Sequence, residues 1–143
     1  MTESFTNSTW PFDSMRDYVA ALDANGLLLR VPETDQDRFQ ATALVFAAND
    51  EFGFVHVPAL LFEKVKVDGR WVQGPLVGLL QGNLHTDAVV FGLPVVPGDG
   101  KASYRRAKAH LACILAKNGG SYPQVPPVEV RVAQQQRDLK MAL

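Results

Sequence analysis

The sequence predicts an α/β (α+β) protein, a single small domain with a short mixed sheet flanked by helices. Three observations predict this class. A chain of 143 residues has the usual size of one domain. Its 47% hydrophobic and 20% charged residues are typical of a globular protein and not of a disordered one. Short runs of aromatic and branched residues also alternate with stretches of helical periodicity, as in proteins that combine sheets and helices.

The first predicted unit is a helix followed by a strand. Apolar residues recur at i, i+3, i+4 and i+7 over residues 15–22, which indicates a helix, with Asp13 or Ser14 as its N-cap. The pair Asn-Gly at 25–26 is a stop signal. The apolar run at 27–31 is short and suits a strand better than a helix.

A second helix is predicted to begin at Asp35 or Asp37 and to end near residues 49–50. The residues on its apolar face are Phe39, Ala43, Phe46 and Ala47. The carboxylates of Glu33, Asp35 and Asp37 lie close together in the sequence, as catalytic pairs do. Acidic residues at a helix start favour the helix dipole, however, so these need no catalytic explanation.

Strands are predicted for the middle of the chain. Residues 54–57 and 59–67 are rich in aromatic and branched side chains, and Asp-Gly at 68–69 is a strong hairpin signal. The pattern resumes at 70–73, and 75–80 reads as another short apolar strand.

The second half of the chain is predicted to be mainly helical. Asn83 is a candidate cap for a helix that runs through Phe91 and closes at Gly92. A loop at 94–100 precedes the clearest helix, over 103–118. The apolar face of that helix holds Tyr104, Ala107, Leu111, Ile114 and Leu115. A further strand is possible at residues 128–132.

The net charge, the cysteine content and the lack of long apolar runs indicate which partners and which compartment to expect. The net charge of −1 provides no positive field for nucleic acid. One cysteine permits neither an internal disulfide nor a Cys-rich zinc site, which fits a reducing compartment. Residues 1–11 are polar and lack the features of a signal peptide, and no apolar run approaches the ~20 residues that span a bilayer. A cytoplasmic protein without a membrane partner is expected.

One candidate for catalysis lies on the last predicted helix. Arg106, His110, Cys113 and Lys117 share one line, so that a thiol flanked by cationic groups could act as a nucleophile with His110 as its base. The alternative is a structural cysteine, since free cysteine is among the most buried residue types. No motif marks an Asp or Asn that would orient His110.

Other candidate sites are weaker. His56, His85 and His110 are far apart in the sequence and lack the spacing of metal ligands. Gly78 and Gly82 indicate a turn between a strand and a helix, where a helix N-terminus can bind an anion. Neither a phosphate-loop Lys nor a dinucleotide fingerprint accompanies them, so a plain backbone turn is favoured.

Three stretches, in order, resemble the N-terminal domain of the UbiD family of prenylated-flavin-dependent reversible decarboxylases. Residues 15–31 are similar to its opening helix, Gly and strand. Residues 58–66, Pro-Ala-Leu-Leu-Phe-Glu-Lys-Val-Lys, nearly match the family's P-A-L-L-F-E-N-V-K. Residues 75–83, Pro-Leu-Val-Gly-Leu-Leu-Gln-Gly-Asn, resemble P-V-L-G-N-L-F-G-T. The chain departs from the family pattern at Leu79 (usually Asn), Gln81 (Phe), Thr86 (often Arg) and Phe39 (often Glu).

The resemblance implies a family domain without the family's active site. The family's flavin-binding domain, with the cofactor and metal ligands and a Glu-Arg-Glu acid/base set, would follow the region resembled here. The implied domains are a polar arm at 1–11, the UbiD-like domain at 12–132 and a polar tail at 133–143. No catalytic, cofactor-binding or metal-binding residue is assigned in this chain.

The resemblance further implies a small non-catalytic subunit of a heteromeric UbiD-like decarboxylase or carboxylase, a lyase for an aromatic or unsaturated carboxylic acid. Prenylated FMN and a divalent metal would then be bound by a large catalytic partner subunit, and a homo-oligomer is also possible. The alternative is a stand-alone binding or scaffolding domain without enzyme activity. The surface distinguishes the two, because an orphaned subunit exposes an apolar patch or self-associates.

Overall fold

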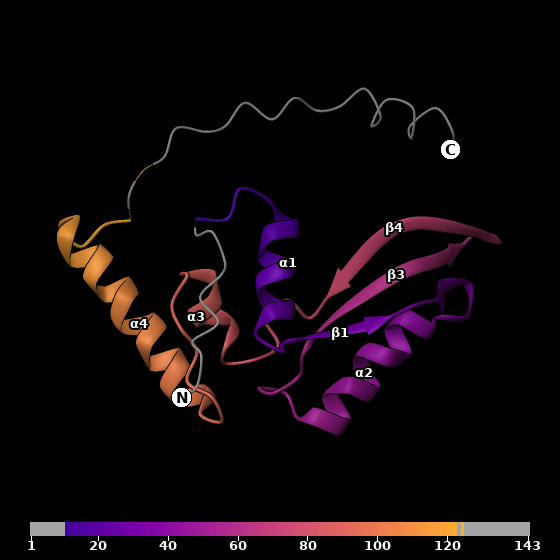
Figure 1. Ribbon diagram of the computed structural model, residues 1–143, viewed down its shortest axis with the longest axis horizontal. Helices are drawn as coiled ribbons and strands as arrows, with labels where there is room; N and C mark the ends of the chain where they lie inside the picture. The colour runs from indigo at the N-terminus through magenta and orange to yellow at the C-terminus, as the bar shows by residue number, and fades with distance from the viewer. Residues whose placement is uncertain (1–10, 123, 125–143) are drawn as a thin grey trace. The chain divides into compact units, whose positions relative to one another are not determined.

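The computed structural model describes residues 11–122 and 124 of the chain (Figure 1). It divides into two compact units, residues 1–113 and residues 114–143, and each is described by itself. The first unit contains a mixed sheet and helices, which confirms the α/β class. The second is described only over residues 114–122 and 124, where the last helix ends.

A long central strand organises the sheet. Strand β3 (Ala59–Val67) pairs in parallel with β1 (Leu28–Val31) and then with β2 (Thr34–Asp35). Strand β4 (Arg70–Gly78) is antiparallel to β3 along nearly its whole length. Because β4 pairs with β3 beside both parallel segments, β1 and β2 share the opposite edge of β3. Figure 1 shows β1 and β4 on either side of β3.

Strands β1 and β2 behave as one extended segment. Leu28 lies opposite Ala59 and Thr34 lies opposite Val65, so both pairings have the same register. Pro32 lies between them and has no N–H to donate to a ladder. It interrupts the hydrogen bonding without shifting the alignment of the chain.

Two strand predictions are corrected. The strands expected at 70–73 and 75–80 are one strand, β4, whose pairing with β3 is irregular between Phe62 and Lys64. A bulge of this kind absorbs an extra residue without ending the strand. Residues 54–57 do not form a strand; they form a turn with a single bridge from His56 to Asn83. Aromatic and branched composition alone therefore overestimated the strand content there.

The turn between β3 and β4 is the predicted hairpin. Asp68 and Gly69 have φ angles of 51° and 71°, the left-handed values of a type I′ turn. The carboxylate of Asp37 binds this turn, accepting hydrogen bonds from the backbone N–H of Asp68 (2.7 Å) and of Gly69 (2.8 Å). Asp37 lies in a short 3₁₀ helix, η1 (Gln36–Arg38), and so does not open the following helix as predicted.

Replacing Asp37 by Ala should lower the free energy of unfolding by about 1–2 kcal/mol, because two charge-assisted hydrogen bonds on an exposed turn are lost. Urea denaturation measures the change. Asp50→Ala is the matched control, since Asp50 is exposed and its side chain has no hydrogen bond or ion pair within the described residues. Equal stability of the two variants would contradict the role of Asp37.

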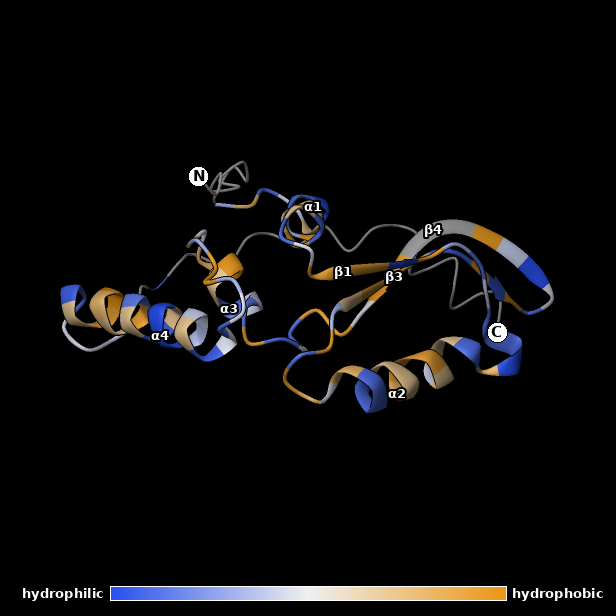
Figure 2. Ribbon diagram, turned by 60° about the horizontal axis from the view of Figure 1, so that its bottom comes forward, coloured by the Kyte–Doolittle hydropathy of each residue, from blue (hydrophilic) through white to orange (hydrophobic). Residues whose placement is uncertain are grey.

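Helices cover both faces of the sheet. Helix α1 (Met15–Ala24) lies on one face and α2 (Gln40–Phe52) on the other (Figure 2). The side chain of Ser14 caps α1, accepting from the N–H of Asp17 at 3.3 Å, which confirms one of the two predicted caps. Two further helices follow in the chain: the short α3 (Thr86–Val90) and then, after a loop, the longer α4 (Gly100–Lys117).

The core has two parts, one on each side of the sheet. Side chains on a strand alternate between faces, so β3 contributes to both. The part next to α1 consists of Tyr18, Ala21, Leu22, Leu27, Ala59 and Val89. The part next to α2 consists of Ala41, Ala48, Val57, Leu60, Phe62 and Val65.

The predicted apolar face of α2 points away from this core. Phe39 and Phe46 are 70% and 66% exposed, and Ala43 and Ala47 are exposed as well. The buried residues of the helix, Ala41 and Ala48, lie on the opposite side. Both sides of α2 are apolar, and the side with Ala41, Val45 and Ala48 is the one that packs against β3. We call the outward set, Phe39, Ala43, Phe46 and Ala47, the α2 apolar face.

The helices in the second half differ from expectation mainly in length. Helix α3 has five residues, because Asn83 does not cap it, although Gly92 (φ 62°) follows its end as predicted. Helix α4 begins at Gly100, three residues early, where Asp99 Oδ1 accepts from the N–H of Ala102 at 2.8 Å. Along α4, Ala107 is buried as expected, whereas Tyr104 is exposed. The possible strand at 128–132 lies outside the described residues.

Candidate functional site

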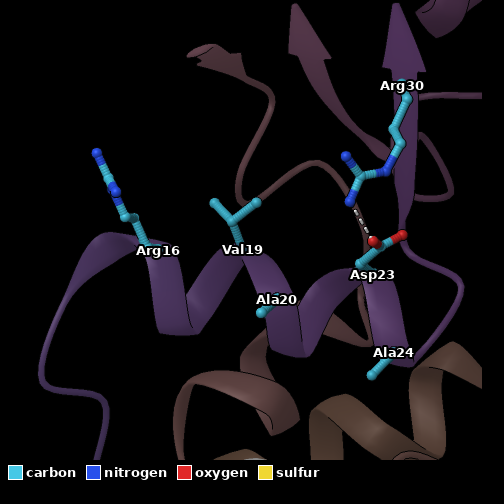
Figure 3. A pocket seen from close by; sticks show the side chains of 6 residues that line it. All are labelled: Arg16, Val19, Ala20, Asp23, Ala24 and Arg30. Atoms are coloured by element: carbon cyan, nitrogen blue, oxygen red, sulfur yellow. Dashed lines mark hydrogen bonds and ion pairs between the residues drawn. The ribbon is translucent and has the colours of Figure 1, made fainter. Parts of the chain in front are cut away.

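One hollow, of about 580 Å³, lies along the outer side of α1 (Figure 3). Two of the charged residues in its lining, Asp23 and Arg30, already form ion pairs. Arg30 pairs with Asp23 and, at 3.0 Å, with Glu63, so both arms of its guanidinium group are used. These hydrogen bonds, that to Asp23 first, raise the pKa of Arg30. Arg16 extends from the other end of the helix in Figure 3. The hollow is therefore an open surface crossed by an ion-pair network and offers little to enclose a ligand.

The fold brings together two of the three histidines. His56 and His85 are 29 positions apart, yet they lie close enough for the charge of one to affect the other. Asn83 holds the two segments together: its side-chain amide donates to the backbone O of His56 (2.9 Å), and its Oδ1 accepts from the N–H of His85 (3.0 Å). A backbone bond from Leu84 to Val55 reinforces this contact.

The His85 side chain is fixed by a buried hydroxyl group. Its Nδ1 lies 2.8 Å from Ser103 Oγ, and Ser103 is fully buried. The same oxygen accepts the N–H of Val96 at 2.8 Å and lies 3.4 Å from the backbone O of Asp99, which can accept its proton. The hydroxyl group of Ser103 can therefore pair with the His85 ring as donor or as acceptor. The network ties the 94–99 loop to α4, and it has no nucleophile exposed for catalysis.

Acidification should weaken this network. Burial first, and the neighbouring His56 second, lower the pKa of His85, while Asp99 acts in the opposite direction. The folded protein therefore binds a proton less readily than the unfolded chain, and its free energy of unfolding should fall as the pH drops below about 6.5. Urea titrations between pH 7 and pH 5 measure the fall. His85→Gln should reduce the pH dependence in this window, whereas His110→Gln should leave it unchanged. An unchanged slope in His85→Gln would contradict the assignment.

The cysteine–histidine pair predicted on the last helix is not assembled. Cys113 is exposed, so it is neither a buried structural cysteine nor enclosed in a site. The ring of His110 packs against Phe91 at 5.4 Å, and Arg106 donates to the backbone O of Pro94 at 2.7 Å. Within the part of the chain that the structure describes, no hydrogen bond links His110 to the thiol or to an orienting carboxylate.

The turn at Gly78 and Gly82 is built for packing. The N–H of Gly82 donates to the backbone O of Leu79 at 3.0 Å, so it is not free for an anion. A Cβ atom on Gly82 would lie 2.5 Å from Cγ1 of the buried Val57, which explains the glycine. Leu79 has a φ of 57°, a left-handed value that is unusual for a leucine. These features support the plain backbone turn.

The remaining candidate carboxylates are also engaged. Glu33 pairs with Lys64 at 2.7 Å and Asp35 with Lys66 at 3.2 Å, while Asp37 binds the hairpin turn. Among residues 11–122 and 124, no three His, Cys, Asp or Glu side chains gather closely enough to hold a metal ion. The close spacing of these acids in the sequence thus has a structural cause.

A second hollow, of about 350 Å³, was not foreseen from the sequence. We call it the Asp87 pocket; it is lined by Asn49, Phe54, Val55, Leu79, Gln81, Gly82, Asn83, Leu84 and Asp87. Burial raises the pKa of the Asp87 carboxyl group. Burial, and then the nearby charge of Asp87, raise the pKa of Tyr18 to about 12. The sequence predicts the turn near Gly78 and Gly82, but nothing in the spacing of the residues predicts that Asn49, Phe54 and Val55 lie beside it.

Comparisons with protein-family models, curated proteins and solved structures found no match to this chain. No helix in the described ranges, 11–122 with 124, combines the length and apolar character needed to cross a bilayer.

Proposed function

We propose that this chain is a small non-catalytic subunit of a UbiD-like decarboxylase or carboxylase that acts on an aromatic or unsaturated carboxylic acid. Prenylated FMN and a divalent metal are bound by the large partner subunit, where the cofactor supplies the chemistry of carbon dioxide release or uptake. The observation that carries the proposal is the α2 apolar face. This face has no cover within the described residues, in which no catalytic constellation is assembled either.

The α2 apolar face is large for an exposed surface. A phenylalanine side chain buries about 150–250 Å² when it is fully covered. Phe39 and Phe46, at 70% and 66% exposure, thus present together roughly 200–300 Å² of apolar area. This is about a third of the ~800 Å² that one partner contributes to a standard interface. Covering this face would supply the apolar centre of such an interface.

The middle turns of helix α2 are apolar on two opposite sides. Figure 2 shows apolar colour there, and both sides carry apolar side chains, one packed on the sheet and the other exposed. Large apolar side chains gathered on an exposed face mark a surface that another chain can cover. Phe39 adds a second cost, because it adopts a left-handed backbone conformation while its ring is exposed. A covering partner would compensate both.

The residues that carry the family resemblance support a scaffolding role. Most of the 58–66 match lies in β3, the central strand, and the 75–83 match covers the end of β4 and the packed turn after it. These residues build the sheet and contain no reactive constellation. The departure at Phe39 replaces the acidic residue frequent in the resembled family with an aromatic one, and Phe39 lies on the α2 apolar face.

Co-expression with a candidate large UbiD-like chain from the same genome tests the proposal. We expect the two chains to co-purify and the decarboxylase or carboxylase activity to require both. Phe46→Asp should abolish co-purification while leaving the melting temperature of this chain nearly unchanged. Tyr104→Asp, at a partly exposed aromatic residue of α4, is the matched control and should still co-purify.

Two results would overturn the proposal. One is a large chain that is fully active and stable without this protein. The other is a monodisperse monomer that keeps its α2 apolar face exposed and binds no large chain in sedimentation experiments; that outcome would favour the stand-alone domain.

A further inference from the structure

We propose that the Asp87 pocket binds an organic cation, a guanidinium or alkylammonium group carried on an apolar stem. The pocket lies where the end of α2 and the turn after it meet the 79–84 turn and α3. All of its lining residues belong to the first compact unit. The inference concerns a site on this chain itself and does not depend on the proposed subunit role.

The first argument is an uncompensated charge. Asp87 lies in the first turn of α3, is only partly exposed, and has neither an ion pair nor a side-chain hydrogen bond within the described residues. Burial disfavours its charged form, as the raised pKa of its carboxyl group indicates. A cation placed in the pocket would compensate this charge, whereas an anion such as phosphate would be repelled.

Two side-chain amides of the lining, those of Asn49 and Gln81, have oxygens that are free to accept hydrogen bonds from a ligand. The Nδ2 group of Asn49 donates to the backbone O of Val45 at 2.9 Å, which leaves its Oδ1 free. The Nε2 group of Gln81 donates to the hydroxyl of Tyr18 at 3.3 Å, and that hydroxyl in turn donates to the backbone O of Leu80. Gln81 therefore also has its carbonyl oxygen free. Both amide orientations are determined by their partners, because a backbone carbonyl can only accept.

Asn83, the remaining polar residue of the lining, already uses its side-chain oxygen and one of its two amide N–H groups. The amide nitrogen of Asn83 binds the backbone O of His56, and its oxygen binds the N–H of His85. The free oxygens of Asn49 and Gln81 thus add acceptors beside the charged carboxylate of Asp87, although each amide group also keeps a second N–H for which no partner is found within the described residues. Guanidinium and ammonium groups carry several donors and no acceptor, so they complement this set.

The walls and the size of the Asp87 pocket also suit an organic cation. Phe54, Val55, Leu79 and Leu84 make the lining largely apolar, and Phe54 is 84% exposed. An exposed aromatic face beside a carboxylate can stack on a cation as well. About 350 Å³ lies at the lower end of the range for ligand pockets, which suits a group the size of one side chain better than a nucleotide.

Two residues of the pocket lining differ from the pattern of the family that the sequence resembles. Leu79 and Gln81 occupy two of the positions at which the sequence departs from the family it resembles, where Asn and Phe are usual. Gln81, which donates to Tyr18 and keeps its side-chain oxygen free, stands where the resembled family usually has Phe. The site is inferred from this chain's own residues and not from the resemblance.

Two sources of such a cation can be separated by experiment. We would titrate the ¹⁵N-labelled full chain with n-butylguanidinium and with the capped tripeptide Gly-Arg-Gly, and follow the amide signals of residues 79–87 and the side-chain amides of Asn49 and Gln81. The expected Kd is on the order of 1 mM for either probe. Tighter binding of the peptide would identify a partner's arginine side chain as the source; equal binding would identify a small free cation.

Matched controls make the test decisive. The capped peptide Gly-citrulline-Gly has the shape of the arginine peptide without its charge and should not bind. Asp87→Asn should weaken binding about tenfold or more, because one charged acceptor is lost, and should not unfold the protein, because it removes a partly buried charge. Asp50→Asn, next to Asn49 but exposed, should bind like the wild type. Absence of saturable shifts with both cationic probes, equal binding of citrulline, or unchanged affinity in Asp87→Asn would each overturn the proposal.

Discussion

Phe62→Ala should lower the free energy of unfolding by about 3–5 kcal/mol, the loss expected when a large core side chain is replaced by a methyl group. Phe62 is 1% exposed and lies in the central strand, in the part of the core under α2. Its neighbours Leu60 and Val65 belong to the same strand, so they cannot move into the vacated space without disturbing the pairing with β4. Most of the cavity would therefore remain.

Urea denaturation at several protein concentrations measures this loss. Phe46→Ala is the matched control, because it removes the same atoms from an exposed position. The Phe46 ring lies on the outward side of α2 and is 66% exposed. Its effect on the isolated chain should stay within about 0.5 kcal/mol. Similar losses in the two variants would show that α2 packs through the face that we describe as exposed.

Gly82→Ala is the second substitution expected to have a large effect, with a loss of about 2–3 kcal/mol. The added Cβ would lie 2.5 Å from Val57 Cγ1, 3.2 Å from the backbone O of Val57 and 3.3 Å from that of Leu79. Val57 is fully buried and branched at Cβ, so its methyl group has little freedom to turn away. The segment at 82 must then move, and the lining of the Asp87 pocket moves with it.

Thermal unfolding compares this variant with Gly78→Ala. A Cβ on Gly78 would meet its neighbours at 3.9 and 4.0 Å, which is ordinary contact, so this control should unfold close to the wild-type temperature. If Gly82→Ala were equally stable, the close approach of the turn to Val57 would not exist in solution. Cation binding, followed in the same variant, should weaken together with stability.

Features that depend on neighbouring residues were predictable from the sequence. The Ser14 cap, the hairpin turn at Asp68 and Gly69, and the stop at Gly92 each involve residues a few positions apart. The backbone preferences of these residue types act over the same short distance. For this reason the elements were found in nearly the correct order, and the α/β class followed from them.

Features that depend on which surfaces meet were not predictable. Helix α2 is apolar on two sides, so periodicity could not show that Ala41 and Ala48 face the sheet and Phe46 faces outward. The prediction of a strand at 54–57 was wrong because, among the residues that the structure describes, this segment pairs with its neighbours only through the bridge from His56 to Asn83.

The candidate sites also depend on which distant segments meet, so the sequence did not predict them. The proximity of His56 to His85 and the Asp87 pocket both arise where residues 49–56 meet residues 79–87. Nothing in the spacing of these residues announces the meeting, because it is produced by the path of β3 and β4 between them. Conversely, Cys113 and His110 share a helix face in the sequence, but the packing of His110 on Phe91 separates their roles.

The α2 apolar face also bears on how much of this protein a cell would retain. If a partner binds this face only when the chain is folded, binding adds about 2.7 kcal/mol to the stability at a free partner concentration 100 times the Kd. Copies that find no partner lack this contribution and display the rings of Phe39 and Phe46, which chaperones and proteases recognise as misfolded surface. Surplus copies would then be degraded faster than assembled ones. The abundance of the chain would follow that of its partner without any separate control of its synthesis.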